Sequence, residues 1–252
     1  MPRTKGLKKQ GRRGFLSLGL AILGLPLGAK TAGAAAAEAA AHTGTHPVMQ
    51  RARLPRRLAA DFYKHIDNRL PLLRPHFESA AQETGFGWRV LAALAYQESR
   101  WRPAAVSPRG AQGVMMLMPV TARKMGVSDV FAPEENILGG ARYLAYIKGR
   151  IPKRIRDPDR TWMALAAYNI GIGHLEDARI ITQMRRKNPD RWADVRANLP
   201  RLEDPHWHTR VKRGYANGSE TVQFVERVTQ FAAILESHVP ESTVVQSSPA
   251  AP

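Results

Sequence analysis

One carboxyl group in this sequence combines an inward position with apolar neighbours. Glu98 lies four residues after Leu94 and seven after Leu91 in an apolar helical run, so it shares their inward face. Burial and the negative end of a helix both disfavour a carboxylate, so we expect a raised pKa. A carboxylic acid that stays neutral near physiological pH is what general acid catalysis requires. The alternative is a glutamate turned to solvent at a frayed helix end, as most glutamates are exposed.

Two further segments could complete a site around this glutamate. Residues 107–119 read SPRGAQGVMMLMP, and their glycine and proline residues predict a loop between residues 102 and 118. A loop directly after an inward acid is where the wall of a cleft would lie. Residues 164–173 read ALAAYNIGIG and lead from the end of a helix into a glycine turn.

The elements that must position these residues are helices. Apolar spacing and Gly/Pro punctuation predict helices over 71–84, 88–99, 119–125, 133–150, 159–170, 173–184, 189–198 and 219–237. Ser219 is the expected cap of the last one. There is no convincing run of alternating strands and no internal repeat. Short connections between several helices indicate a compact all-α domain.

The amino-terminal residues have the composition of an export signal. Residues 1–13 are basic, residues 15–27 are apolar but too few for a comfortable membrane span, and residues 32–34 offer an A-x-A cleavage site. The paired Arg12 and Arg13 resemble a twin-arginine signal. An ordinary Sec signal that contains two arginines is the alternative. Either signal predicts export to the periplasm, with no stable membrane anchor after cleavage.

Charge and cysteine content limit the function classes. The chain of 252 residues has no cysteine, which excludes disulfides, thiolate metal sites, a cysteine nucleophile and a lipid-modified cysteine. The net charge is +17, and +10 remains once the seven basic residues of 1–34 are set aside. This balance favours a polyanionic partner such as nucleic acid, anionic lipid or a cell-wall polymer. The predicted division is a signal peptide at 1–34, a linker at 35–50, a catalytic domain at 51–240 and a disordered tail at 241–252.

The ordered motifs resemble those of lytic transglycosylases, enzymes with a goose-lysozyme-like catalytic domain that cut peptidoglycan. The resemblance rests on Glu98-Ser99, on the two segments above, and on GHLEDAR (173–179) and NPDRWADVR (188–196), and it covers about residues 55–237. The Gly-Val-Met-Met string at 113–116 is most similar to the membrane-bound lytic murein transglycosylase F branch. The resemblance implies a lysozyme-like all-α fold with a substrate cleft, peptidoglycan glycan strands as substrate, and no cofactor.

The resemblance also implies how Glu98 acts. In this family a single glutamate protonates the bond between N-acetylmuramic acid and N-acetylglucosamine. It then takes the proton from the C6 hydroxyl of the muramic acid as that oxygen attacks C1. The product is a 1,6-anhydro sugar, and no water is consumed. Most glycosidases use two carboxylates, whereas only one stands in a motif position here.

Substrate contacts would come from the same motifs, at Ser99, Ser107, Met115, Met116, Tyr168, Asn169 and Glu220. Tyr168 would orient the Glu98 carboxyl or contact the sugar, and core packing is its alternative. Ser107 would donate to the N-acetyl carbonyl or only shape the turn before Pro108. Asn169 is equally suited to a substrate contact and to a helix end.

The remaining contacts have structural alternatives too. Met115, Met116 and Leu117 would line the cleft and desolvate Glu98, although methionine more often fills a core. Glu220, in the string SETVQFV (219–225), would approach the cleft or be a solvated glutamate in a first helical turn. Soluble family members usually have glutamine where Met116 stands, so one polar contact is not carried over. F-type enzymes also have a solute-binding-like domain, and membrane-bound relatives often have an anchoring cysteine, so regulation and anchoring are not carried over either.

Three other functions compete with this reading. A hydrolytic muramidase would need a base for water, for which Glu220 or Asp204 could serve. A non-catalytic wall-binding protein would not need Glu98. A nucleic-acid-binding protein would fit the charge, but the sequence has no helix-turn-helix or RNA-binding signature and begins with an export leader. A metal site is not expected, since His206 and His208 lack a third ligand, and no protein partner is predicted.

Overall fold

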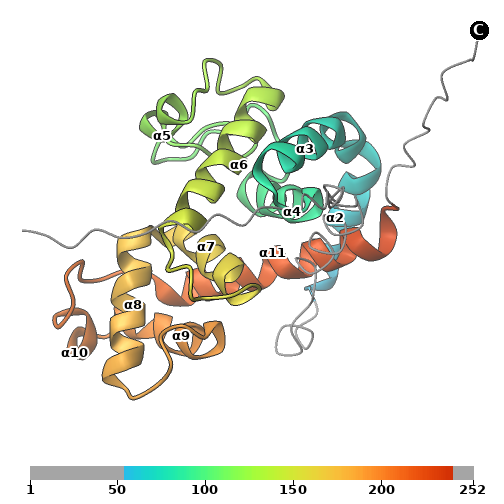
Figure 1. Cartoon of the computed structure of the whole chain (residues 1–252). Helices are drawn as coiled ribbons and strands as arrows, with labels where there is room; N and C mark the ends of the chain where they lie inside the picture. The colour runs from blue at the N-terminus through green and yellow to red at the C-terminus, as the bar shows by residue number, and fades with distance from the viewer. Residues whose placement is uncertain (1–53, 241–252) are drawn as a thin grey trace, which may run out of the picture.

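The computed structural model describes residues 54–240 (Figure 1). The predicted signal peptide, linker and tail lie outside the described residues. Within 54–240 the chain forms helices, turns and two isolated bridges, and no strand, so the predicted all-α class is confirmed. The elements are α2 (Arg56–Asn68), α3 (Leu70–Thr84), α4 (Trp88–Ser99), α5 (Pro119–Lys124), α6 (Pro133–Arg150), α7 (Asp159–Ile170), α8 (Ile172–Met184), α9 (Trp192–Asn198), η1 (Leu199–Glu203), α10 (Pro205–His208) and α11 (Gly218–His238).

Periodicity located the longer helices well. The predicted bounds of α4, α6 and α7 are confirmed, and those of α3, α5, α8, α9 and α11 differ by one to three residues at one or both ends. The sequence analysis did not predict α2, in which Phe62 alone is fully buried, nor the short elements η1 and α10. The prediction of Ser219 as a cap was wrong. The Asn217 side chain caps α11 by accepting a hydrogen bond from the backbone N–H of Glu220, and its Nδ2 donates to the Glu220 carboxylate.

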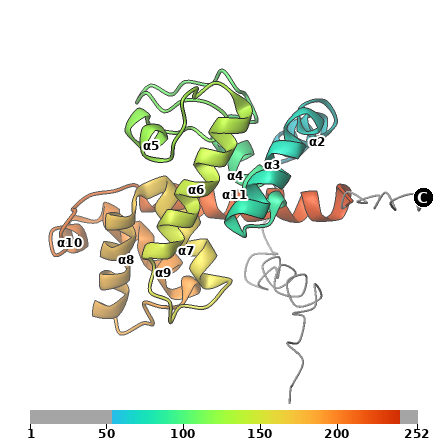
Figure 2. The same cartoon turned by 45° about the horizontal axis from the view of Figure 1, so that its top comes forward.

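Helix α4 lies at the centre of the molecule and carries the candidate acid. It packs against α3 on one side and against α11 on another, and residues 91–95 have no exposed surface. Three of those five residues are alanines, which let neighbouring helices approach closely. In both views α8, α9 and α10 lie at one end of the molecule and α2 and α3 at the other, while α11 spans the distance between them (Figures 1 and 2). The last turn of α4 is therefore held from several directions.

An aromatic cluster fixes the carboxyl end of α4 against its neighbours. The rings of Phe62, Tyr96, Trp101 and Phe231, from α2, α4, the following turn and α11, lie with centroids 4.4 to 5.4 Å apart. Trp101 is 1% exposed, and its indole N–H donates to the carbonyl of Ala92 at 2.8 Å. Aromatic pairs of this kind stabilise by about 0.5–1.5 kcal/mol each beyond the burial of their area.

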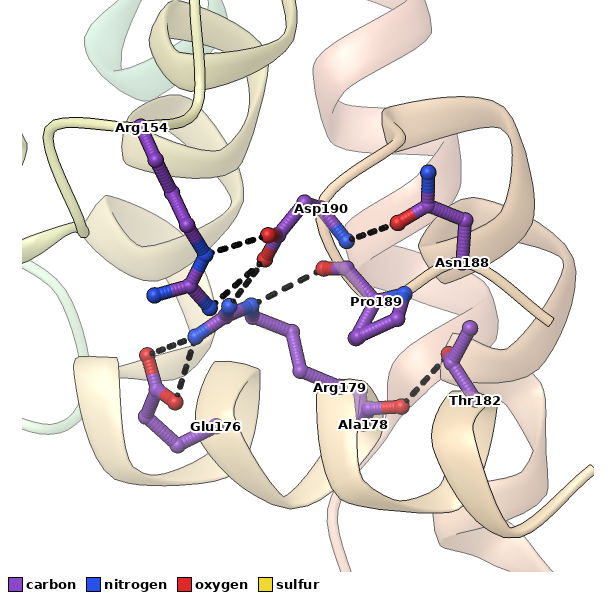
Figure 3. A network of polar contacts seen from close by, with 8 residues as sticks. All are labelled: Arg154, Glu176, Ala178, Arg179, Thr182, Asn188, Pro189 and Asp190. Carbon is purple, nitrogen blue, oxygen red and sulfur yellow. Dashed lines mark hydrogen bonds and ion pairs between the residues drawn. The ribbon is translucent and has the colours of Figure 1, made fainter. Parts of the chain in front are cut away.

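At the opposite end, a buried arginine holds the motif segments 173–179 and 188–196 together (Figure 3). Arg179 on α8 donates to both carboxylate oxygens of Glu176, to the carbonyl of Pro189 and to Asp190. Arg154 donates to the other face of Asp190 at 2.5 and 3.1 Å, and this contact chiefly lowers the pKa of that carboxyl. The motif residues here serve the fold, because their polar groups are satisfied by one another.

Candidate active site

Glu98 occupies the last turn of α4, where the chain changes direction sharply. The two residues that follow α4, Arg100 and Trp101, have left-handed backbones with φ of 54° and 56°. Two successive left-handed non-glycine residues are uncommon and carry strain, which such sites store when the surroundings fix them. Trp101 is anchored in the aromatic cluster, so the turn is held. This turn sends the chain into the loop that follows Glu98.

The environment of Glu98 agrees with the prediction of a neutral acid. The residue is partly buried, and burial raises the pKa of its carboxyl to about 8. No charge of a second carboxylate contributes to that shift. Within residues 54–240 the carboxyl has no hydrogen bond and no ion pair. Glu98 is thus protonated at neutral pH and is not consumed in a structural contact.

The loop after Glu98 is fixed by a buried asparagine that the sequence analysis did not single out. Asn136 on α6 has no exposed surface. Its Oδ1 accepts from the N–H of Met115 at 2.7 Å, and its Nδ2 donates to the carbonyls of Gln112 at 3.2 Å and Val130 at 2.9 Å. Gly113, with φ of 80°, passes so close that an added Cβ would lie 2.3 Å from Asn136 Nδ2 and from the Val130 carbonyl oxygen. The glycine and the asparagine together set the course of the loop.

Tyr168 lies near Glu98, as the resemblance implied. Burial raises its pKa well above the ordinary value, and the charge of Glu98 adds to the rise. Its hydroxyl donates to the carbonyl of Met115 at 2.8 Å, so its proton is not directed at Glu98. The phenol oxygen can still accept a hydrogen bond from a protonated carboxyl. Tyr168 therefore connects α7 to the loop and lies beside the candidate acid.

A second tyrosine belongs to the same group of residues and was also missed. The ring of Tyr143 on α6 lies 5.3 Å from that of Tyr168, and burial raises the pKa of its hydroxyl. Asn136 and Tyr143 are seven residues apart on one face of α6, and Gly140 lies between them. A polar asparagine on this inward face was the available signal, because buried polar groups need partners.

The structure contradicts the prediction that Met115 lines a cleft. Its side chain has no exposed surface and packs against Gly140, where an added Cβ would lie 2.6 Å away. Leu117 is also buried, at 2% exposed. Met116 differs from both, since it is partly exposed and has a left-handed backbone with φ of 49°. Of the three apolar residues, only Met116 is placed to touch a ligand.

The hydroxyl groups of Ser99 and Ser107 form hydrogen bonds mainly with the backbone. Ser99 is 2% exposed, and its hydroxyl donates to the carbonyl of Val114 at 2.7 Å and accepts from the N–H of Arg102. This geometry favours positioning of the loop over the predicted contact with substrate. The Ser107 oxygen accepts from the N–H of Ala111 at 2.9 Å, which agrees with a turn residue, but Ser107 is partly exposed and its hydroxyl proton stays available.

Asn169 and Glu220 each form a hydrogen bond with a different residue at the start of α11. Asn169 is exposed, and its Oδ1 accepts from the hydroxyl of buried Thr221 at 2.8 Å. Glu220 is exposed, and its carboxylate accepts from the Asn217 side chain at 2.9 Å. The structural reading of Glu220 as a capping residue is favoured by this contact. Its contact with substrate stays a prediction.

Two searches for other kinds of site gave no candidate. Among residues 54–240 there is no group of three or more His, Cys, Asp or Glu side chains that could hold a metal ion, and His206 and His208 belong to none. None of the helices in the same range has the length and apolarity needed to cross a bilayer.

The fold and the site together define an all-α domain built around one candidate general acid. Residues 75–190 match the model of the transglycosylase SLT domain. Over these residues the chain is similar to the transglycosylase SLT domain, and its resemblance to the lytic transglycosylases is confirmed.

Similar curated proteins are named membrane-bound lytic murein transglycosylase F. Those of Marinobacter nauticus and Alcanivorax borkumensis are each 50% identical over 177 residues, which is 70% of this chain. The match covers 35% and 38% of their lengths, so the chain spans little more than a third of these relatives. Among solved structures, the soluble lytic transglycosylase SLT70 of Escherichia coli aligns over 71% of this chain and 26% of its own at 24% identity and a TM-score of 0.49, a likeness too weak to support a conclusion.

Proposed function

We propose that this protein is a peptidoglycan lytic transglycosylase in which Glu98 is the catalytic residue. The observation that carries the proposal is a single glutamic acid, kept neutral by burial, in a transglycosylase SLT domain. The sequence relatives named lytic murein transglycosylase support the same substrate class.

The chemistry needs one group that is first an acid and then a base. The Glu98 carboxyl donates its proton to the glycosidic oxygen, and the bond from C1 of N-acetylmuramic acid to that oxygen breaks. The Glu98 carboxylate then takes the proton of the C6 hydroxyl as the C6 oxygen bonds to C1. The carboxyl is regenerated, the leaving sugar gains a hydroxyl, and the new end is a 1,6-anhydro sugar.

The surroundings of Glu98 favour this route over hydrolysis. Glycosidases that hydrolyse through two carboxylates need a second acid near the first, and burial alone raises the pKa of Glu98. The two acids that could have served as base are otherwise engaged. Glu220 accepts a hydrogen bond from the Asn217 side chain that caps α11, and Asp204 caps α10 by accepting from the N–H of His206 at 2.9 Å.

The other residues predicted to contact substrate differ in how exposed they are and in whether they have a free hydrogen-bond donor or acceptor. Tyr168 accepts a hydrogen bond from the protonated Glu98 and so orients it. Ser107 donates its free proton to the N-acetyl carbonyl, while Met116 and Asn169 contact the sugars. Ser99 and Met115 act through the loop that they hold, and the substrate cleft lies between this loop and α7.

The test of the proposed function is the identity of the new sugar ends after digestion of purified murein. Product ends of the 1,6-anhydro type, lighter by one water than reducing ends, are expected. Reducing N-acetylmuramic acid ends alone would reject the transglycosylase in favour of a muramidase.

Activity should fall as the pH rises through about 8. Only the protonated Glu98 can start the reaction, and its pKa in the folded protein is raised to about 8, so the acid form predominates below that pH and is lost above it. The measurement is kcat/KM on murein from pH 5 to pH 10, with thermal unfolding followed over the same range as the control. A decline centred near pH 5, or no decline by pH 10, would remove the raised pKa from the mechanism.

We also propose export to the periplasm by the twin-arginine route. The support is the leader sequence, because residues 1–53 lie outside the described part of the structure. Replacing Arg12 and Arg13 with lysine keeps the charge but removes the paired guanidinium groups. The precursor should then accumulate in the cytoplasm, as fractionation and immunoblotting would show. If export of the variant is unchanged and depends on the Sec channel, the twin-arginine route is wrong. The prediction of export to the periplasm would still hold.

A further inference from the structure

A charged hollow lies beside the carboxyl end of α4, apart from the residues assigned above. It has a volume of about 570 Å³ and is lined by Asp61, His65, Arg69, Arg100 and Arg102, which come from α2 and from the turn after Glu98. We call it the arginine pocket. All five lining side chains are ionisable, and their apolar surface comes from the stems of charged or polar residues. Such a lining recognises charge.

The balance of charge in the arginine pocket favours an anion. Three guanidinium groups face one carboxylate, and His65 adds little positive charge because burial, and then Arg69, lowers its pKa. One carboxylate cannot neutralise three arginines. Asp61 forms an ion pair with Arg100 at 3.6 Å, between side chains that are about half exposed.

Two of the arginines are held in place by hydrogen bonds to backbone carbonyls, and each keeps further N–H donors for a ligand. Arg69 spends one N–H on the carbonyl of Arg100 at 2.7 Å, and Arg102 spends Nε on the carbonyl of Ser99 at 3.0 Å. A guanidinium has five N–H donors in a planar fork that matches a carboxylate. His65 is fixed by its hydrogen bond to the hydroxyl of Tyr96 at 2.9 Å. The pocket is thus built before any ligand arrives.

The position of the pocket relative to Glu98 decides what kind of ligand can use it. Tyr96 and Glu98 are two residues apart, so their side chains leave α4 about 200° apart around the axis, and the pocket lies across the helix end from the acid. An α-helix with its side chains is about 10–12 Å wide. A peptide of four extended residues reaches about 13–14 Å. Glu98 lies one residue before the end of α4, so a chain attached to a sugar held there can reach the pocket by passing over the helix end.

We propose that the arginine pocket binds a carboxylate of the peptide stem of murein. The inference rests on the proposed function, which supplies the glycan that carries the peptide. The stems are the part of murein rich in carboxylates, and the pocket is lined for a carboxylate and not for a sugar ring. The site recognises substrate across the helix from the bond that is cut, and it makes peptide-bearing strands better ligands than bare ones.

The test is a set of binding titrations on the full chain carrying Glu98→Gln, so that no turnover occurs. The probes are a disaccharide tetrapeptide, the same compound with its carboxyls amidated, the bare disaccharide and inorganic phosphate. Amidation should weaken binding about tenfold, and Arg100→Gln should weaken binding of the free acid about fivefold, since each removes one charge pair at short range. Asp61→Asn should strengthen it about threefold, and 1 M salt should reduce all of these differences.

The matched control is Arg201→Gln, which removes an exposed charge near α10 at the other end of the molecule (Figure 1). It should leave the titrations unchanged. Equal effects of Arg100→Gln and Arg201→Gln, or equal affinity for the amidated and free peptides, would overturn the proposal. Binding of phosphate as tight as that of the peptide would reduce the pocket to an unspecific anion site. If the murein digest gives reducing ends while these titrations give the expected results, the proposed function is wrong and the proposal for the arginine pocket still holds.

Discussion

Glu98→Gln is expected to abolish cleavage of murein while leaving the fold intact. Glutamine preserves the size and polarity of the side chain but cannot give or take the proton. General acid or base assistance is typically worth about 10²–10⁴-fold. One residue serves in both roles here, so the loss should reach about 10⁴-fold or more. The measurement is the rate of murein solubilisation by the purified variant, with Glu236→Gln, an exposed glutamate of α11, as the matched control.

The stability of this variant separates catalysis from structure. The folded protein keeps the Glu98 proton up to about pH 8, whereas the unfolded chain releases it near the ordinary glutamate pKa of 4.5. Folding therefore becomes less favourable as the pH rises between those values, and glutamine escapes that penalty. The melting temperature of Glu98→Gln should equal that of the wild type at pH 4 and match or exceed it at pH 8. A large fall at both pH values would make Glu98 a structural residue.

Asn136→Asp should have the largest effect on stability and should lower activity with it. The change keeps the shape but removes the two N–H donors that reach the carbonyls of Gln112 and Val130, and it leaves a carboxylate with no exposed surface. Breaking a buried polar arrangement in this way costs about 3–5 kcal/mol. The free energy of unfolding from urea denaturation should fall by that amount, and the loop beside Glu98 should loosen.

The pH dependence of the stability of Asn136→Asp gives a second check. A protonated carboxyl regains one O–H donor, so the deficit should shrink as the pH falls toward 4. The control Asn68→Asp, at the exposed end of α2, should change stability by less than about 1 kcal/mol. A deficit below about 1 kcal/mol for Asn136→Asp would show that the loop does not depend on these hydrogen bonds.

The sequence predicted the features that periodicity determines. The bounds of α4 and the inward position of Glu98 follow from apolar residues at helical spacing. In the structure α4 packs against α3 and α11, as that spacing requires. The raised pKa of Glu98 was predicted from two causes, burial and the negative end of the helix. Burial is the cause that the structure supports.

Features that depend on contacts distant in sequence were not predictable. Met115 was expected in a cleft wall, but a loop has no period from which to read its faces, and the left-handed backbone of Met116 turns its neighbours inward. Asn136 and Tyr143 meet the loop and Tyr168 only after α6 packs against α7. The arginine pocket joins α2 to a turn more than thirty residues later. Helix α2 itself was predictable, because Leu58, Phe62 and Ile66 recur at helical spacing, but this period was overlooked.

The most direct test of the central claim is digestion of purified murein in water enriched in ¹⁸O, followed by mass spectrometry of the products. Intramolecular attack by the C6 oxygen takes no atom from solvent. Wild-type protein should therefore release 1,6-anhydro muropeptides that carry no ¹⁸O. The Glu98→Gln variant should release no muropeptides. Products with a reducing N-acetylmuramic acid that contains one ¹⁸O at C1 would show that water is the nucleophile, and would contradict the account of Glu98 as acid and base of a lytic transglycosylase.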